Sequence, residues 1–320
     1  MVSSAAPAPP SSSFALHERL LARLRLRHLR LVDALATHAN LRRAAEAVHM
    51  SQPAATQMLR ELEALLDVSL FERHARGMRI TEAGRLLAAH ARMAIDALRV
   101  ATEGLAALAA QEARPLRIGA LDAALASVLQ PALPRLLAQH PALRLVIEEG
   151  SSERLRTGLT GGAFDIVLLR KPAHPEPGQR FIALCSDRMV VIASAGHPAA
   201  RRKRLRLSDL ADSRWILPPP HFAVRQALDA AWAREKKAPR EHSVQTLSPH
   251  VLRSLLAQPD VVMPVPRTLL DRLDRSAVVE LKLAQLDAPI EPLGLLYRSG
   301  DDSPVKTLLI DFLVEQAKGA

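Results

Sequence analysis

A short set of hydrogen-bonding side chains, spaced as on one face of a helix, carries the most informative chemistry in this sequence. Gln52, Thr56, Gln57 and Arg60 occur within SQPAATQMLRELEALL, whose leucines recur on the opposite face. Amide, hydroxyl and guanidinium groups can hydrogen-bond to base edges and phosphates in the major groove of DNA. A solvated polar face explains any single one of these residues about as well, so the hypothesis depends on the whole set and its surroundings.

The flanking residues predict the elements that would hold this face outward. Ser51 is suited to cap the helix at its start, and Pro53 is tolerated in the first turn because its missing N–H has no partner there. Asn40 can cap a preceding short helix, in which Ala44 and Ala45 are small enough for two helices to cross closely. Apolar residues at one-face spacing predict another helix before it. The sequence therefore predicts a helix-turn-helix.

A charged hairpin is predicted directly after these helices. LFERHARGMRIT places Gly77 at a turn between apolar flanks, and the arginines beside the turn can then reach phosphates or the adjacent minor groove as a wing. His74 has no Cys or His partner at metal-ligand spacing, so we expect an exposed or phosphate-facing side chain. The candidate DNA-binding residues are Arg43, Ser51, Gln52, Pro53, Thr56, Gln57, Arg60, Arg73, Arg76 and Arg79.

The run LVDALATHANLRRAAEAVHMSQPAATQMLRELEALLDVSLFERHARGMRITEAG resembles the DNA-binding domain of LysR-type transcriptional regulators. The shared features are the AA pair, SQPA, the LExLL run, LFER and TEAG, over about residues 24–84. The resemblance implies that Gln52, Pro53, Thr56 and Gln57 lie in the major groove and that wing arginines touch the backbone or minor groove. An Arg is common at the position of Gln57, so a charge-assisted contact is lost here. The wing and turn are most similar to the branch that includes galactose-binding-protein regulators and some regulators of aromatic-acid catabolism.

Residues 81–110 are predicted to form one long helix with a dimerisation seam. Apolar side chains repeat every seven residues in two interleaved sets, at Leu87, Ala94, Ala101 and Leu108 and at Ala91, Leu98 and Leu105. Such a seam fits a partner helix, and packing against the chain's own globular part is the alternative. The resemblance implies the first, because this helix is the dimerisation linker in LysR-type regulators.

Beyond Pro115 the pattern changes to alternating strands and helices. PLRIGAL, LRLVIEEG and FDIVLLR are typical of buried strands with helical stretches between them, which predicts a parallel sheet covered by helices. The alternation recurs to the end of the chain and fits two α/β lobes with a ligand cleft, similar to periplasmic solute-binding proteins. The resemblance to LysR-type regulators implies an effector domain of this fold.

The predicted fold class is therefore α+β and multidomain, with an N-terminal winged helix-turn-helix, a long linker helix and a C-terminal two-lobed effector domain like periplasmic binding proteins. The predicted parts are a disordered tail and lead-in at 1–23, a DNA-binding domain at 24–81, a linker helix at 82–114 and an effector domain at 115–320. Within the effector domain, lobe I is placed at about 115–184 and 289–320 and lobe II at about 185–288.

Ligands of open α/β sheets lie beyond the carboxyl ends of strands, which selects the candidate effector residues. Loops at such ends carry carboxylate and hydroxyl groups, at Asp122, Ser151, Ser152 and Ser248. The resemblance to LysR-type regulators implies that the loop 219–225, with His221 and Arg225, also lines the effector pocket. Each serine can instead be a helix cap, and Arg225 can be a carboxylate clamp or a surface charge. Asp122 would repel a purely anionic ligand, so it fits a polyol, a sugar or an amine better.

The composition of the chain limits its possible partners and cell compartment. The formal net charge of +10 favours a polyanionic partner, and a single cysteine, Cys185, allows no intrachain disulfide. We expect a cytoplasmic protein, because the first residues lack the features of a secretory signal and no apolar run is long enough to span a membrane. The basic run RRKRLRL at 201–207 is expected to be a solvated loop rather than a nucleic-acid patch.

Taken together, these features predict a sequence-specific DNA-binding transcription regulator controlled by a small-molecule effector. Its partners would be double-stranded DNA with a two-fold related operator, a sugar or an organic or aromatic acid as effector, and a second copy of itself in a homodimer or homotetramer, with no membrane. No catalytic motif, cofactor or metal is indicated by the sequence, so we expect no enzyme. The alternative is a solute-binding receptor without sequence-specific DNA binding, which would leave the first 114 residues unused.

Overall fold

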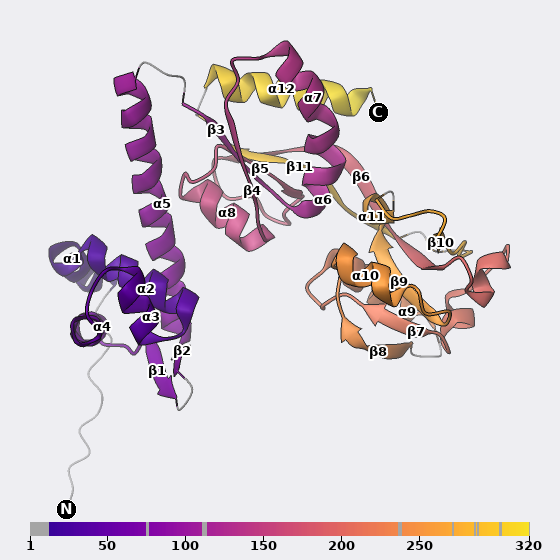
Figure 1. Cartoon of the computed structure of the whole chain (residues 1–320), viewed down its shortest axis with the longest axis horizontal. Helices are drawn as coiled ribbons and strands as arrows, with labels where there is room; N and C mark the ends of the chain where they lie inside the picture. Colours follow the sequence, from indigo (N-terminus) through magenta and orange to yellow (C-terminus); the bar gives the residue numbers. More distant parts are fainter. Residues whose placement is uncertain are drawn as a thin grey trace, which may run out of the picture. The chain divides into compact units, whose positions relative to one another are not determined.

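The computed structural model of the 320-residue chain describes residues 13–74, 77–110, 114–235, 239–270, 272–284, 286, 288–300 and 303–319. Two compact units make up the chain, Met1–Arg114 with Arg156–Phe164 and Pro115–Leu155 with Asp165–Ala320 (Figure 1). No helix among the described residues is both long and apolar enough to cross a membrane.

The first unit contains the helices and the hairpin that the sequence predicts. Its elements are α1 (Ser13–Arg23), α2 (Leu26–His38), α3 (Leu41–Ala47), α4 (Gln52–Leu66), β1 (Phe71–His74), β2 (Gly77–Ile80) and α5 (Glu82–Ala110). Leu31, Val32, Leu35, Ala44 and Leu62 lie in one core and are each at most 2% exposed. The small alanines let α2 and α3 approach closely, as the sequence indicated.

Residues 13–23 differ from the predicted lead-in, because they form the separate helix α1. Leu16, Leu20 and Leu24 are half-buried at four-residue spacing, and the arginines between them remain exposed. A one-face apolar stripe of this kind stabilises a helix by packing. The predicted tail, residues 1 to about 13, lies outside the described part of the chain as far as residue 12.

The second unit is built on a mixed sheet with helices packed against it. Along the hydrogen-bonded path the strands are β4 (Leu145–Glu149), β3 (Leu116–Ala120), β5 (Ile166–Arg170), β11 (Pro289–Arg298), β6 (Gln179–Ser194), β9 (Val261–Pro266), β7 (Arg214–Leu217) and β8 (Arg240–Gln245), with β10 (Val278–Glu280) on β6. The helical segments are α6 (Asp122–Ala124), a π-helical turn (Leu125–Leu129), α7 (Gln130–Gln139), α8 (Ser152–Thr160), α9 (Ala223–Trp232), α10 (Pro249–Leu255), α11 (Arg267–Leu270) and α12 (Pro304–Lys318), with short 3-10 helices at Pro198–Arg201 and Leu207–Leu210.

The prediction of a parallel sheet is right for β4, β3 and β5 and again for β7, β8 and β9, and it is wrong for β11 and β6, which lie between these two groups. β11 lies between β5 and β6 and is antiparallel to both, and β6 is antiparallel to β9. Over 100 residues separate β11 from β5 in the chain, so local patterns could not place it there. The 16-residue strand β6 pairs with β11 as far as Arg188 and with β9 from Met189 onward, and so belongs to both halves of the sheet.

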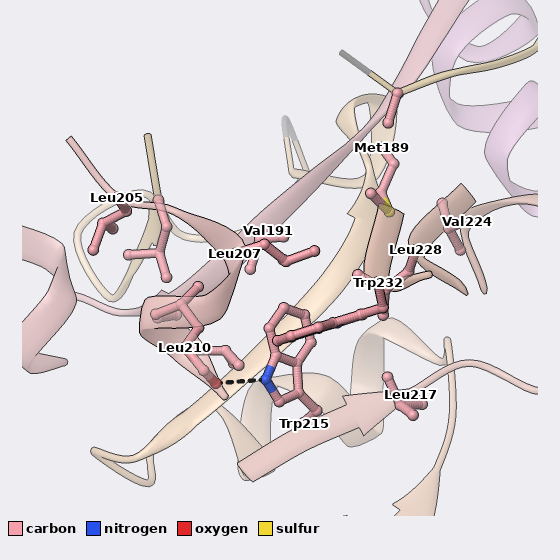
Figure 2. Close-up of a cluster of buried hydrophobic side chains, with 14 of the residues drawn as sticks. Met189, Val191, Leu205, Leu207, Leu210, Trp215, Leu217, Val224, Leu228 and Trp232 are labelled. Carbon is pink, nitrogen blue, oxygen red and sulfur yellow. Dashed lines mark hydrogen bonds between the residues drawn. The ribbon is translucent and has the colours of Figure 1, made fainter. Parts of the chain in front are cut away.

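Each half of the sheet has its own apolar core. Around β3, β5 and β11 the core includes Ile118, Leu168 and Leu295, all 0% exposed. In the other half, Trp215 and Trp232 meet edge to face with ring centroids 5.6 Å apart, and the Trp215 Nε1 donates to the Leu210 carbonyl oxygen at 2.8 Å (Figure 2).

The basic run at 201–207 is held at the surface by two buried leucines. Leu205 and Leu207 are 0% and 6% exposed, and Leu205 forms an isolated β-bridge with Leu283. The charged residues of the run, 201–204 and 206, are exposed. Alternation of anchored leucines and solvated charges agrees with the expected solvated loop.

Candidate functional site

The helix α4 separates a buried underside from an exposed polar face. Ala55, Met58, Leu59 and Leu62 are at most 8% exposed and pack into the core of the first unit. At its start the Ser51 side chain accepts a hydrogen bond from the Ala54 N–H at 3.4 Å, which confirms the predicted cap. Core packing and capping thus fix which side of α4 faces outward.

The outward face carries the residues that the sequence selected. Gln52, Pro53, Gln57 and Arg60 are exposed and Thr56 is partly exposed. Arg43, on the neighbouring α3, is exposed as well, and its backbone N–H donates to the Asn40 side chain at 3.1 Å.

Two hydrogen bonds refine how this face can act. The Thr56 hydroxyl donates to the Gln52 carbonyl oxygen at 2.9 Å, so towards a ligand it offers an acceptor lone pair and its methyl group. The Gln57 Nε2 donates to the Glu61 Oε1 at 3.0 Å, which orients the Gln57 amide and places a carboxylate on the same face. Glu61 was not among the predicted contact residues, although it lies one turn after Gln57.

The hairpin β1–β2 forms the predicted wing. Glu72 pairs with Arg79 and Arg73 with Met78 across the two strands, and both arginines are exposed. His74 is exposed and lies 3.4 Å from the Glu72 carboxylate, in agreement with the expected exposed side chain. Arg76 lies outside the described residues.

Glycine at position 77 allows the wing to dock on the helices. Gly77 has a φ of +142°, and a Cβ there would lie 2.7 Å from the Ala39 carbonyl oxygen. The Met78 N–H donates to that same oxygen at 2.9 Å. The hairpin is therefore held against the end of α2 by its backbone.

Glu63, which was singled out in the sequence only as part of the LExLL run, joins the wing to α4. Its Oε1 accepts hydrogen bonds from the backbone N–H groups of Leu70 and Phe71, at 2.7 and 3.2 Å. Hydrogen bonds to a charged acceptor are stronger than neutral ones. The available signal was a Glu that follows a core Leu and precedes the apolar pair Leu70 and Phe71 by seven and eight residues.

The start of α5 is fixed to the same loop. Thr81 Oγ1 donates to the Ser69 or Leu70 carbonyl oxygen, at 2.8 and 3.0 Å, and accepts from the Gly84 N–H at 3.0 Å. A Cβ on Gly84 would lie 2.1 Å from the Leu70 oxygen, so only glycine permits this approach. The TEAG motif thus has a packing role.

Further along α5, apolar side chains of the predicted seam divide into two groups. Ala91 is 0% exposed and Leu87 is partly buried, because this part of the helix packs on α2. Leu98 and Leu105 are 51% and 68% exposed. The Arg92 guanidinium also ties α5 to α2 through Asp33. Packing within the chain therefore holds for the first part of the helix, and pairing of the exposed part with a second helix stays a prediction.

In the second unit, Asp122 follows β3, and its carboxylate already forms an ion pair within the chain. The Arg272 guanidinium donates to both Asp122 carboxylate oxygens, at 2.7 and 3.0 Å. These hydrogen bonds with Asp122 are the main reason that the pKa of Arg272 is raised, and the nearby Glu149 contributes to the same shift. Arg272 was not selected from the sequence.

The remaining effector candidates differ in how they are held. The exposed Ser151 accepts from the Arg154 N–H at 3.3 Å as a helix cap, and Ser152 is exposed. Arg225 donates to Asp229 at 2.9 Å and also lies 3.7 Å from Glu241, so it is not a free carboxylate clamp.

His221 and Ser248 complete the set. His221 is exposed and its ring packs on Phe222 with centroids 4.6 Å apart. Ser248 precedes α10 without a side-chain capping bond, and its N–H donates to Thr246 Oγ1 at 3.1 Å. Among the described residues no group of three or more His, Cys, Asp or Glu could hold a metal ion.

Comparison with known protein families identifies both units. The family described as "Bacterial regulatory helix-turn-helix protein, lysR family" matches residues 26–85, and "LysR substrate binding domain" matches residues 109–318. The chain belongs to the LysR family. This confirms the predicted family and the predicted fold class.

Relatives of this LysR-family chain are named as transcriptional regulators. The HTH-type transcriptional regulator GbpR of Azospirillum brasilense is 32% identical over 280 residues, which are 87% of this chain and 82% of GbpR. The HTH-type transcriptional regulator PcaQ of Agrobacterium fabrum is 36% identical over 177 residues, or 55% of this chain and 57% of PcaQ.

Solved structures show the same fold. The crystal structure of CbnR, a LysR family transcriptional regulator, has a TM-score of 0.65 and 19% identity and covers 92% of this chain and 99% of CbnR. Full-length CbnR complexed with its target DNA has a TM-score of 0.63 and 19% identity, with coverage of 92% and 100%. The protein is a LysR-type DNA-binding transcriptional regulator with an effector-binding domain, and the receptor alternative is not favoured because it has no use for residues 26–85. The family consists of transcriptional regulators, not enzymes.

Proposed function

We propose that the outer face of α4 reads the major groove of an operator, with Gln52, Pro53, Thr56 and Gln57 at base edges and Arg60 at the phosphates. The observation that carries this is the separation of faces on α4, whose apolar side is buried while its amides and guanidinium are exposed. Amide groups can pair with adenine in a bidentate manner.

The wing and the neighbouring helix supply contacts that do not depend on sequence. The exposed Arg73 and Arg79, together with Arg43, neutralise backbone phosphates, and Ser51 contributes at the start of α4, which it caps. Arg76 shares this role on the strength of the sequence alone. Because DNA is its partner, we place the regulator in the cytoplasm.

Self-association of the chain would present two DNA-binding domains to one operator. Leu98 and Leu105 project from α5 seven residues apart and are more than half exposed in a single chain. A second copy of the helix would bury them in a coiled-coil seam. A homodimer or homotetramer formed in this way requires two-fold related half-sites spaced by helical turns.

The effector-binding domain takes its ligand between two lobes, with boundaries at about 184–185 and 288–289. Asp122, Ser151 and Ser152 follow the carboxyl ends of β3 and β4, where open α/β sheets bind ligands. From the other lobe come His221, Arg225 and Ser248. The ligand is a sugar or an organic or aromatic acid, and its binding shifts the balance between arrangements of the lobes or protomers.

Selection from random DNA with the full-length protein tests the DNA-binding part. Enrichment of a two-fold related sequence is the expected result, and log affinity for it should fall linearly with log salt concentration by about 0.9 per phosphate neutralised. Recovery of unrelated sequences would contradict the proposal.

A thermal-shift screen of sugars, organic acids and aromatic acids tests the effector part, because a ligand of the folded state raises the melting temperature by mass action. Arg225→Gln and Ser248→Ala should reduce the shift caused by any hit. An unchanged shift of the melting temperature in both variants would mean that the ligand binds at another site.

A further inference from the structure

A buried hydrogen-bond network lies where β6 passes from one half of the sheet to the other. Asp187, whose side chain is 0% exposed, accepts from Arg170 at 2.7 Å and from the Thr268 hydroxyl at 2.8 Å. Arg170 comes from the end of β5 and also donates to the Glu291 carbonyl oxygen at 2.8 Å. The network therefore joins β5, β6, β11 and α11 at one point. Buried charged networks of this kind are costly to disrupt.

A second, exposed ion pair joins the same halves of the sheet elsewhere. Arg272 follows α11, and Asp122 follows β3, 150 residues away in the chain. Their side chains are 32% and 44% exposed and meet through two hydrogen bonds of 2.7 and 3.0 Å. An exposed pair of this kind contributes little stability and weakens with salt.

The short helix α11 connects the two contacts. Thr268 is held by the buried Asp187, and Arg272 follows it by four residues. A small rotation about Asp187 would leave the buried network intact while separating Arg272 from Asp122. The buried Asp187 network is thus suited to act as a pivot, and the exposed Asp122–Arg272 pair as the contact that opens.

We propose that the Asp122–Arg272 ion pair is a latch that closes the two lobes of the effector domain over the ligand cleft, with the Asp187 network as its pivot. The inference rests on the proposed ligand position between the lobes. Opening exposes one carboxylate and one guanidinium at the cleft, so an anionic or a cationic ligand competes with one half of the latch. A neutral ligand binds with the pair intact.

Glu149 biases this competition. It pairs with Ala120 on the neighbouring strand, two residues before Asp122, and its negative charge helps to raise the pKa of Arg272. A ligand carboxylate that binds Arg272 must therefore displace Asp122 and is also repelled by Glu149. A hydroxyl group is uncharged, so it is not repelled and need not displace Asp122. The latch makes the cleft selective for ligand charge.

Hydrogen exchange of the full-length protein without ligand tests the latch in Asp122→Asn, Arg272→Gln and the double variant. We expect the backbone amides of Leu125 and Leu273, which lie beside the two latch residues on opposite lobes, to exchange about two- to fivefold faster in each single variant. The double variant should match the singles, because either change alone breaks the pair. Arg234→Gln, at an exposed arginine of the same unit, is the control and should leave both amides unchanged.

Salt provides the second measurement. Exchange in the unsubstituted protein should approach that of Arg272→Gln in about 1 M NaCl, where screening is strongest, and Arg272→Gln itself should respond little. Any of three results would overturn the latch. The first is faster amide exchange only on the lobe that carries the substitution, and the second is a double variant whose effect is the product of the two single effects. The third is an equal response to salt in the unsubstituted protein and in Arg272→Gln. Because no ligand is used, failure to find an effector has no bearing on this result.

Discussion

The carboxylate of Glu63 offers a sharp test of how the wing is positioned. It accepts two backbone N–H groups, from Leu70 and Phe71 at 2.7 and 3.2 Å, and lies partly buried. Glu63→Ala leaves both donors without this acceptor, at a cost of about 2 to 3 kcal/mol for bonds to a charged group. Glu63→Gln keeps an oxygen acceptor without the charge, so we expect about half that loss.

Hydrogen exchange at Leu70 and Phe71 measures the effect locally, which avoids assigning one unfolding free energy to a chain of two units. The loss corresponds to roughly 30- to 150-fold faster exchange in Glu63→Ala, since about 1.4 kcal/mol is a factor of ten. Glu61→Gln, two positions away and exposed, is the matched control and should change exchange there by less than about threefold. Equal exchange in Glu63→Ala and the unsubstituted protein would refute the anchoring role.

Three further predictions concern packing, assembly and pH. Gly84→Ala should destabilise the first unit by about 1 to 3 kcal/mol in thermal unfolding, because the Leu70 carbonyl oxygen would lie 2.1 Å from the new Cβ. Gly104→Ala, which has no atom within 4 Å of the new Cβ, should instead stabilise the unit by up to about 1 kcal/mol. A loss of stability in both variants would contradict this. Leu98→Lys with Leu105→Lys should shift sedimentation towards monomer, and unchanged sedimentation would place the interface elsewhere. Burial lowers the pKa of His28 from its usual 6.5, so protonation favours the unfolded state and stability should fall as pH drops below about 6.5; a His28→Gln protein with the same pH profile would contradict this.

Much of the first unit was predictable because its signals are local. Ser51 and Asn40 cap helices as their side chains suggested, and the alanines and leucines at helical spacing are buried as expected. Only residues a few positions apart are needed to recognise these patterns. The helix α1 was not predicted as a separate element, because residues 1–23 were assigned as a whole to a tail and lead-in.

The second unit was predictable only in part, since its decisive contacts are remote in sequence. The order of strands and helices followed from periodicity, but the insertion of β11 between β5 and β6 depends on tertiary packing. Asp122 was selected as a ligand contact without its partner Arg272, because nothing local indicates a pair 150 residues apart. Arg225 was left open between two roles, and its bonds to Asp229 were a one-turn pattern that could have been noticed.

The most direct test of DNA reading by α4 is a fluorescence-anisotropy titration of the Gln57→Ala protein on its selected operator and on a scrambled duplex. Gln57 is exposed on α4 and its amide is oriented by Glu61. We predict a loss of about 1 to 3 kcal/mol on the operator and little change on scrambled DNA, whereas Arg73→Ala should weaken both alike. Equal losses on the two duplexes for Gln57→Ala would contradict the claim that this face reads base sequence.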